Sequence, residues 1–305
     1  MLEHVAGSAF ARGCAYVEAH GRPLEIARLR HRLGRGPASA VVAALTPFQN
    51  PDGGFGHGLE PDIATPASTA IATSIGFQAL LAAQIGDDEP MVRDALAWLE
   101  ASFDGERGVW PIIGPQVDLA PHAFWWDSAG DLAGRWNGFR FNPSAELLGV
   151  LYAYRAAAAP GLIIRAEQAL IDDLANGRTL AGAYDIKAGL RLLRGAATPS
   201  RVKAAIEPPL RAAILALDAD DAHAPVLELA PVPGEALTEL VSPRVAAAFD
   251  QLLGEQQADG SWAPFWDWSA VDAAAWSEAE RDWRAILTRQ AVEVLAAYGR
   301  TDGPT

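Results

Sequence analysis

Hydrophobic residues recur along most of this chain at the three-to-four-residue spacing of an α-helix, and strand-like alternation is nearly absent. The pattern predicts helices at about 2–20, 23–34, 38–48, 66–85, 89–103, 162–176, 182–195, 199–216 and 280–298, and two more that begin at Asn142-Pro143 and Ser242-Pro243. Helices that are apolar nearly all round alternate with amphipathic ones. Two concentric rings of helices explain this alternation, because inner helices pack on both sides while outer helices face water on one.

A glycine-rich polar loop separates two of the apolar helices, and a second copy of it lies near the C-terminus. The first copy is Gln49-Asn-Pro-Asp-Gly-Gly-Phe55 and the second is Gln256-Gln-Ala-Asp-Gly-Ser-Trp262. Both place glutamine and aspartate three apart, followed by glycine, a small residue and an aromatic, which indicates a repeated unit. Because the copies lie near both ends and no stretch has the composition of a linker, we predict that residues 1–305 form a single domain.

The second copy matches the repeated QW motif of squalene-hopene and oxidosqualene cyclases, and the first is similar to it. The order of loops and helices likewise resembles the α/α toroid of terpenoid cyclases and protein prenyltransferase β subunits. This resemblance implies an all-α protein, an α/α toroid of (α/α)6-like build. It also implies that Gln49, Asp52, Gln256 and Asp259 tie helix ends together and do no chemistry, in keeping with the ability of such side chains to satisfy backbone groups at helix ends.

For a cyclase, the resemblance implies acid-initiated cyclisation, in which an aspartate of an Asp-x-Asp-Asp motif protonates an alkene or epoxide. The segment Pro61-Asp-Ile-Ala-Thr65 has the surroundings of that motif, but Ala64 stands where the acid belongs. A literal Asp218-Ala-Asp-Asp221 also occurs, with Asp220 as its candidate acid, although prolines follow it and a solvated acidic loop is the favoured explanation.

His57, Glu60 and Asp62 form the polar cluster of most interest, since they flank glycines that let the backbone approach a ligand. With Asp220 they are the candidate catalytic residues. A carboxylic acid desolvated here by aromatic neighbours would serve as a general acid. Alternatively, Glu60 and Asp62 stabilise the N-terminus of the helix predicted to begin at Thr65-Pro66.

Aromatic residues are concentrated in two stretches, 124–141 and 262–276. They would either line a cavity, where they stabilise carbocations or stack on sugars, or form a lid that adds to the core. The candidate substrate-binding residues are Trp125, Trp126, Asp127, Trp136, Phe265, Trp266, Asp267 and Trp268.

Composition limits the partners and cofactors. The net charge of −14 argues against a nucleic-acid partner, which needs a basic surface. Cys14 is the only cysteine, so intrachain disulfides and cysteine-rich zinc sites are excluded, and no metal site is predicted. We expect no cofactor, although a diphosphate substrate would allow one, Mg²⁺. The first residues lack a basic start followed by an apolar core, and no later segment reaches about 18 uninterrupted apolar residues, so we expect a cytoplasmic protein.

One further charged stripe, Arg28, Arg32 and Arg35, would either hold an anion such as diphosphate or be solvated. The leading functional hypothesis is a terpenoid-cyclase-like protein that binds a hydrophobic or isoprenoid small molecule in a central cavity, with acid-initiated cyclisation as its reaction. A carbohydrate-active helical barrel is a second hypothesis and predicts two carboxyl groups about 5–10 Å apart across an open groove. A non-catalytic scaffold with a filled centre is the third.

Overall fold

A computed structural model describes residues 7–128, 141–177, 180, 182–217 and 225–301. In these residues all regular secondary structure is helical, with only isolated β-bridges besides, which confirms the all-α prediction. The chain divides into two compact units. Unit 1 consists of Met1–Leu45 with Pro225–Thr305, and unit 2 consists of Thr46–Ala224.

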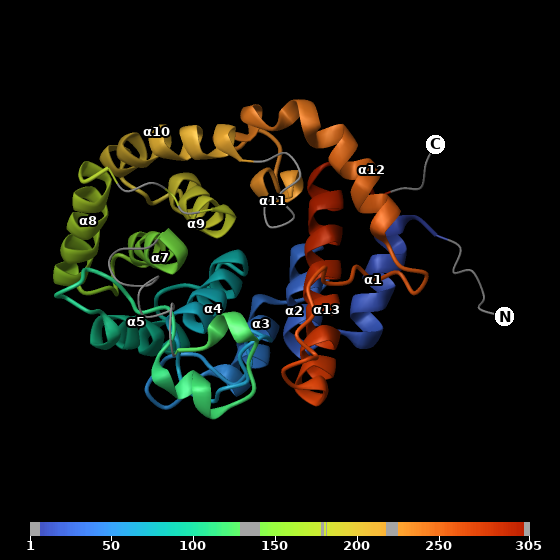
Figure 1. Cartoon of the computed structure of the whole chain (residues 1–305), viewed down its shortest axis with the longest axis horizontal. Coiled ribbons are helices and arrows are strands. Elements are labelled where there is room, and N and C mark those ends of the chain that lie inside the picture. The colour runs from blue at the N-terminus through green and yellow to red at the C-terminus, as the bar shows by residue number, and fades with distance from the viewer. Residues whose placement is uncertain (1–6, 129–140, 178–179, 181, 218–224, 302–305) are drawn as a thin grey trace. The chain divides into compact units, whose positions relative to one another are not determined.

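Unit 1 is built around its longest helix, α13, which packs against α1 and α2. Its helices are α1 (Ala9–His20), α2 (Pro23–Arg32), α3 (Ala38–Leu45), α11 (Val226–Leu229), α12 (Val245–Glu255) and α13 (Ala273–Ala297), with short 3-10 turns η5 (Thr238–Leu240) and η6 (Ser242–Arg244) (Figure 1). Helix α2 also contacts α3, and α11 contacts α12. Phe249, Trp262 and Leu295 belong to one buried cluster, and Val17, Leu29 and Val292 belong to another.

Unit 2 consists of helix pairs in chain order. Its elements are η1 (Thr46–Phe48), α4 (Ala70–Ala82), α5 (Pro90–Ser102), η2 (Pro115–Leu119), η3 (Phe124–Trp126), the π-helical turn η4 (Phe141–Ala145), α7 (Glu146–Ala153), α8 (Pro160–Ala175), α9 (Ala183–Arg194) and α10 (Ser200–Ala216). The mostly buried helices α4, α7 and α9 contact one another in succession, and α5, α8 and α10 each pack against one of them (Figure 1). The predicted alternation of buried and amphipathic helices therefore holds within this unit.

The first glycine loop, residues 49–55, is a corner that ties α5 to the loop. The Gln49 side-chain amide donates to the carbonyl oxygens of Gly53 and Met91, both at 3.0 Å, and Met91 lies in the first turn of α5. The Asp52 carboxylate accepts a hydrogen bond from the Gly54 N–H at 2.9 Å. Both polar side chains of the motif therefore bind backbone groups, the structural role expected of them.

The second glycine loop, residues 256–262, makes the same set of bonds inside unit 1. The Gln256 amide donates to the carbonyl oxygens of Gly260 at 3.0 Å and Ala9 at 2.9 Å, and the Asp259 carboxylate accepts from the Ser261 N–H at 2.9 Å. Ala9 is the first residue of α1. Helix α1 therefore contacts the second corner in the same way that α5 contacts the first.

The aromatic residue of each corner is fixed to the helix that follows its loop. The Phe55 N–H donates to Thr73 Oγ1 in α4 at 3.1 Å, and the Trp262 N–H donates to Thr288 Oγ1 in α13 at 3.0 Å. Both threonines are completely buried. The repeat seen in the sequence is thus a repeat of hydrogen bonds as well as of residue types.

A third corner, residues 104–110, follows α5. The Trp110 N–H donates to Ser144 Oγ at 3.3 Å, as the other two aromatics do to threonine. Its indole N–H donates to the Leu99 carbonyl at 2.8 Å, just as the Trp262 indole donates to the Leu252 carbonyl at 2.7 Å. The third corner is therefore structural, like the other two.

Several helix boundaries differ from the sequence prediction, among them the starts of α4 and α13. Helix α4 begins at Ala70, after Thr69, whose hydroxyl accepts from the Ala72 N–H at 3.1 Å; the prediction of a start at Thr65-Pro66 is wrong. The reason is that the Thr65 carbonyl accepts the His57 N–H at 2.9 Å and so belongs to the preceding loop. The alternative in which Glu60 and Asp62 stabilise the N-terminus of this helix is therefore wrong as well. At the other end of the chain, α13 starts at Ala273 rather than at 280.

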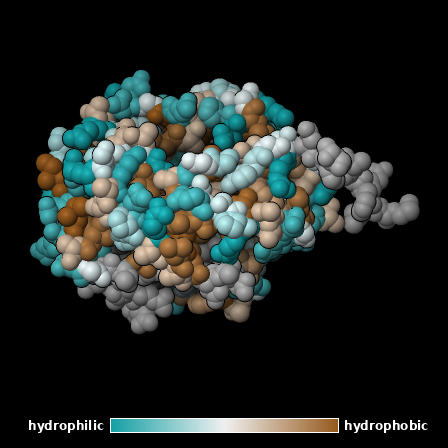
Figure 2. All heavy atoms as spheres, turned by 90° about the horizontal axis from the view of Figure 1, so that it is seen from above, coloured by the Kyte–Doolittle hydropathy of each residue, from teal (hydrophilic) through white to brown (hydrophobic). Residues whose placement is uncertain are grey.

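The outer surface is of mixed polarity. Figure 2 shows hydrophobic side chains interspersed among hydrophilic ones on one face. Scattered exposed apolar side chains such as Ile164 and Leu215 are common on proteins and need no partner to explain them. Over the described residues, every helix is too short or too polar to cross a lipid bilayer.

Candidate functional site

Two segments of unit 2 that are distant in sequence form what we call the paired layer, residues 57–65 and 115–128. The Ala64 N–H donates to the Pro121 carbonyl at 2.9 Å, and the Ala123 N–H donates to the Asp62 carbonyl at 3.0 Å. Between these bonds, Ile63 and His122 form an isolated antiparallel bridge. The pairing places the predicted catalytic loop next to the first part of the predicted aromatic stretch.

The predicted catalytic residues of the first segment lie in different environments. His57 is exposed, has a positive φ of 56°, and places Nε2 2.8 Å from Asn50 Oδ1 of the first corner. Glu60 and Asp62 are buried, with 8% and 4% of their surfaces exposed. Asp220, the fourth candidate, lies outside the described residues. His57 is thus engaged by the corner, whereas the two carboxyl groups lie inside the paired layer.

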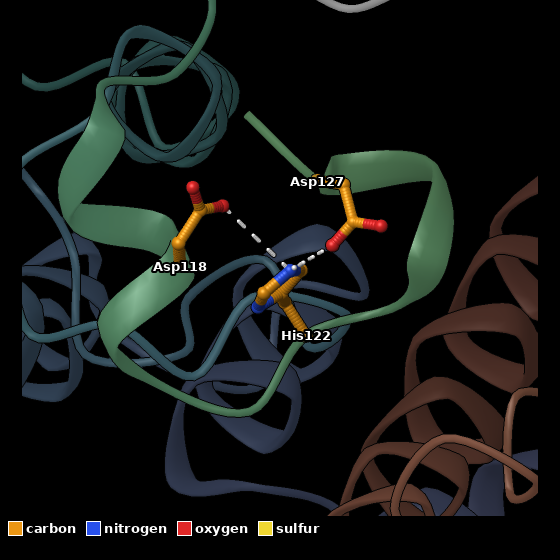
Figure 3. A group of neighbouring side chains, drawn as sticks. All are labelled: Asp118, His122 and Asp127. Atoms are coloured by element: carbon orange, nitrogen blue, oxygen red, sulfur yellow. Dashed lines mark hydrogen bonds and ion pairs between the residues drawn. The ribbon is translucent and has the colours of Figure 1, made fainter. Parts of the chain in front are cut away.

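The second segment contains a cluster of one histidine and two aspartates (Figure 3). His122 Nε2 lies 2.9 Å from Asp127 Oδ1 and 3.9 Å from Asp118 Oδ1. One side-chain atom from each of the three residues lies within 4.8 Å of the other two. The imidazole is mostly buried, while both carboxylates reach the surface, so the cluster is open to solvent on the carboxylate side.

Short hydrogen-bonded turns hold the three side chains in place. His122 Nδ1 lies 2.7 Å from the Ala120 carbonyl oxygen, which can only accept, so this nitrogen carries a proton and Nε2 faces the carboxylates. Asp118, in η2, accepts the Ser128 N–H at 2.9 Å and also bonds the Ser128 hydroxyl. Asp127 follows η3 directly, and that turn is closed by a 2.8 Å bond from the Trp126 N–H to the Ala123 carbonyl.

Neighbouring groups shift the pKa values of His122 and Asp118 in opposite directions. Burial alone would lower the pKa of His122, but the hydrogen bond to the Ala120 carbonyl and the charges of Asp127 and Asp118 outweigh it and raise the pKa. The hydrogen bonds from Ser128 lower the pKa of Asp118. Both effects stabilise an imidazolium next to carboxylate.

The predicted substrate-binding aromatics of unit 2 adjoin this cluster. Trp125 and Trp126 belong to η3, directly before Asp127, and Trp125 packs edge-to-face against the exposed Phe124 with ring centres 4.8 Å apart. The Trp126 indole N–H is buried and has no hydrogen-bond partner within the described part of the chain. Trp136 lies outside the described residues.

The corresponding aromatics of unit 1 are mainly structural. Trp268 is almost completely buried and packs on Trp276, with ring centres 5.6 Å apart. Phe265 and Trp266 form an edge-to-face pair at 4.9 Å. The Asp267 carboxylate accepts the Ser269 N–H at 2.6 Å, and this bond lowers its pKa. Most of this group therefore fits the alternative of a lid that adds to the core.

A groove of about 590 Å³ lies in unit 1 along α2 and α3. Small and apolar residues line most of it, together with Arg30 and Arg35. None of the predicted catalytic or substrate-binding residues lines this groove, although Arg35 of the predicted charged stripe does. This groove therefore does not support the predicted hydrophobic central cavity.

Arg28, one residue of the predicted charged stripe, lies beside a buried cluster of ion pairs in unit 1. Arg289 Nε lies 2.6 Å from Glu25 Oε2, and Arg22 lies 2.9 Å from the other oxygen of Glu25. Burial would raise the pKa of Glu25, but Arg289, Arg22 and Arg28 outweigh it and lower the pKa to about 2. Burial and the neighbouring Arg289 lower the pKa of Arg28 to about 10. The Arg28 guanidinium is accordingly not part of a freely solvated face.

Of the three cluster residues, only Asp127 is among those predicted from the sequence to bind substrate. Their spacing, Asp-x-x-x-His-x-x-x-x-Asp, lies in an irregular segment where no helical or strand period brings such positions together. Only the aromatic composition of the stretch drew attention to it. Searches against family models, curated proteins and solved structures gave no match to this chain.

Proposed function

We propose that this chain is an α/α-toroid protein of the terpenoid-cyclase type that binds a small molecule at the paired layer of unit 2. The observation that carries the proposal is the position of the His122 cluster, which adjoins Trp125 and Trp126 on one side and the loop with Glu60 and Asp62 on the other. Polar groups next to aromatic side chains at a loop layer are typical of small-molecule sites.

The toroid part of the proposal is supported by each unit separately. In unit 2, three buried helices follow one another, each with an outer partner, as a toroid would repeat. In unit 1, α1 completes the corner of the last helix pair, so the two ends of the chain meet at one repeat. Three corners with matching hydrogen bonds are more than chance similarity of two short loops would give.

For the ligand we propose an isoprenoid, whose apolar chain would lie against the tryptophans of η3. Indole rings attract cationic centres through their quadrupole, so the same side chains would stabilise a carbocation. Glu60 or Asp62 would donate the proton that starts cyclisation, because both carboxyl groups are buried next to the site and a proton donor of this kind must be shielded from water.

A carbohydrate is the second candidate ligand, favoured by the solvent-open carboxylates of Asp118 and Asp127 next to Trp125. Paired carboxyl groups about 5–10 Å apart are what glycoside hydrolysis requires. In this cluster, however, the His122 imidazole lies within hydrogen-bonding distance of Asp127 and close to Asp118, where the scissile bond would have to sit. The isoprenoid is therefore the better-supported ligand.

Ligand titration tests both candidates. The protein would be titrated with prenyl diphosphates, with an isoprenoid epoxide and with oligosaccharides, while tryptophan fluorescence is recorded and products are sought by mass spectrometry. We expect an isoprenoid to bind, and Trp125→Leu to weaken its binding at least about tenfold, the effect of losing about 1.4 kcal/mol of contact. Trp266→Leu is the matched control, because Trp266 occupies a similar aromatic pair in unit 1.

Three outcomes decide between the candidates. Unchanged isoprenoids together with an unchanged fluorescence signal would remove the isoprenoid proposal. Saturable binding of an oligosaccharide, lost in Trp125→Leu, would establish the second candidate in its place. Equal losses in Trp125→Leu and Trp266→Leu would show that the ligand does not bind at the paired layer.

A further inference from the structure

We propose that Asp118, His122 and Asp127 bind one divalent transition-metal ion of the Zn²⁺ type. The proposal rests on the geometry of this cluster alone and does not depend on the identity of the organic ligand. The three side chains belong to one short segment of unit 2, and each offers one ligand atom to a common point between them.

The distances suit a small tetrahedral ion. With metal–ligand bonds of about 2.0–2.1 Å, two ligands of a tetrahedral Zn²⁺ ion lie about 3.4 Å apart. The His122 Nε2 atom is 2.9 Å from the Asp127 oxygen and 3.9 Å from the Asp118 oxygen, so the two observed distances lie on either side of that value. The ligand oxygens of the two aspartates lie at most 4.8 Å apart, so the exposed carboxylates would close by up to about 1.4 Å around the ion, through the rotamer changes that surface side chains make readily.

The orientation of the imidazole is the one that metal binding needs. Ligating histidines generally donate their second ring N–H to a carbonyl or carboxylate, which fixes the tautomer and turns the lone pair toward the metal. His122 has this arrangement, with Nδ1 held by the Ala120 carbonyl and Nε2 directed at the carboxylates. Ser128 in turn orients the Asp118 carboxylate through two hydrogen bonds.

The set of ligand atoms also selects the class of metal. Mg²⁺ and Ca²⁺ prefer six or more oxygen ligands, whereas an imidazole nitrogen suits Zn²⁺ and its neighbours in the first transition series. Three protein ligands leave the fourth position of a tetrahedral ion for water or a ligand. The exposed sides of Asp118 and Asp127 would give the ion and that fourth ligand access from solvent.

A proton and a metal ion compete for the same atom. His122 Nε2 lies 2.9 Å from Asp127 Oδ1, so a proton on this nitrogen would form an ion pair where the metal would bind. With metal, this proton must leave, since only a neutral imidazole donates its lone pair. Metal affinity should therefore fall when the imidazole is protonated.

Zinc binding to the full-length chain tests the proposal. The protein, first treated with a chelator, would be titrated with ZnCl2 by calorimetry, and bound zinc would be counted after equilibrium dialysis. We expect one Zn²⁺ per chain, unaffected by an excess of Mg²⁺, and a visible spectrum of four-coordinate Co²⁺ when cobalt is substituted. Asp127→Asn should weaken zinc binding by at least about tenfold.

Two controls keep the result interpretable. Asp127 is largely exposed, so Asp127→Asn should fold as the parent does even if a His122 variant does not. Asp267→Asn changes an exposed aspartate of a similar aromatic turn in unit 1 and should leave zinc binding unchanged. Absence of stoichiometric zinc, or binding that Asp127→Asn leaves unaltered, would overturn the proposal and leave the cluster as an ion pair that pins the loop.

Zinc stoichiometry is measured without any isoprenoid or sugar. A chain that binds zinc at this cluster but no isoprenoid would refute the proposed function while supporting the metal site, and the reverse result would do the opposite.

Discussion

The corners can be tested at the glycine where the chain comes closest to its neighbour. Gly53 has a φ of +91°, and a Cβ atom added to it would lie 2.1 Å from the Asp94 carbonyl oxygen of α5. Gly58, five residues later, has a φ of +70° and nothing within 4 Å of an added Cβ. The pair Gly53→Ala and Gly58→Ala thus separates the effect of close packing from the effect of a left-handed backbone.

The expected magnitudes follow from those two geometries. A non-glycine residue in the left-handed region costs about 1–2 kcal/mol, and this is the only term that applies to Gly58→Ala. Gly53→Ala adds a clash with backbone that no side-chain rotation relieves, and overpacking of this kind costs about 1–3 kcal/mol more. At the second corner, Gly260 has the same φ, but its added Cβ would lie 2.7 Å from the Arg12 carbonyl oxygen, so Gly260→Ala should fall between the two.

Thermal unfolding followed by circular dichroism provides the measurement. A further loss of about 2 kcal/mol corresponds to a melting temperature about 4–8 °C lower in Gly53→Ala than in Gly58→Ala, for a cooperative unit of about 150–250 residues. Tryptophan fluorescence should report the same order of the three variants. Equal melting temperatures for Gly53→Ala and Gly58→Ala would refute the close approach of the corner to α5, and with it the equivalence of the corners.

Three further predictions concern buried polar groups. Arg289→Met should destabilise the protein by about 3–5 kcal/mol, because it leaves Glu25 buried without its closest cation. A loss of less than about 1 kcal/mol, measured by urea unfolding, would show that the pair is not buried. Thr73→Val and Thr288→Val should each cost about 1–3 kcal/mol by removing the acceptor of a buried N–H, and Thr73→Ser should cost less because Ser144 serves in the third corner; a neutral Thr73→Val would contradict this. Because the pKa of Glu25 is lowered, its ionised carboxylate contributes about 3 kcal/mol to the free energy of unfolding at pH values above its ordinary pKa. This stability is lost as the pH falls toward about 2. Melting temperatures that stay constant between about pH 6 and pH 3 would contradict this prediction.

The sequence predicted the helices and the corners well because both depend on local patterns. Apolar spacing of three to four residues identified most helices of both units, and the residues Gln-x-x-Asp-Gly identified two corners. The third corner escaped notice because it has Asp104 and Trp110 but no glutamine, and more residues separate its aspartate from its aromatic. Its equivalence lies in the hydrogen bonds of Trp110, which no residue pattern reveals.

The candidate site was harder to predict because it depends on pairing between distant segments. His122 is placed by a bridge to Ile63 and by the turn that ends at the Ala120 carbonyl, neither of which has a sequence period. The start of α4 was misplaced for a related reason, since the Thr65 carbonyl is used by the preceding loop rather than by the helix. Sequence patterns describe the elements, whereas the loops between them depend on tertiary hydrogen bonds.

The corners also indicate where chemistry can reside in this fold. In the first two corners, the glutamine and aspartate side chains form hydrogen bonds with backbone groups. In all three corners, the backbone N–H of the aromatic residue donates to a buried hydroxyl. The proposed ligand site accordingly uses a segment between a corner and the helix that follows it. Of these segments, the one after Trp110 is the longest before its helix, and it contains the His122 cluster. We therefore expect this segment, rather than a corner, to bind the proposed ligand.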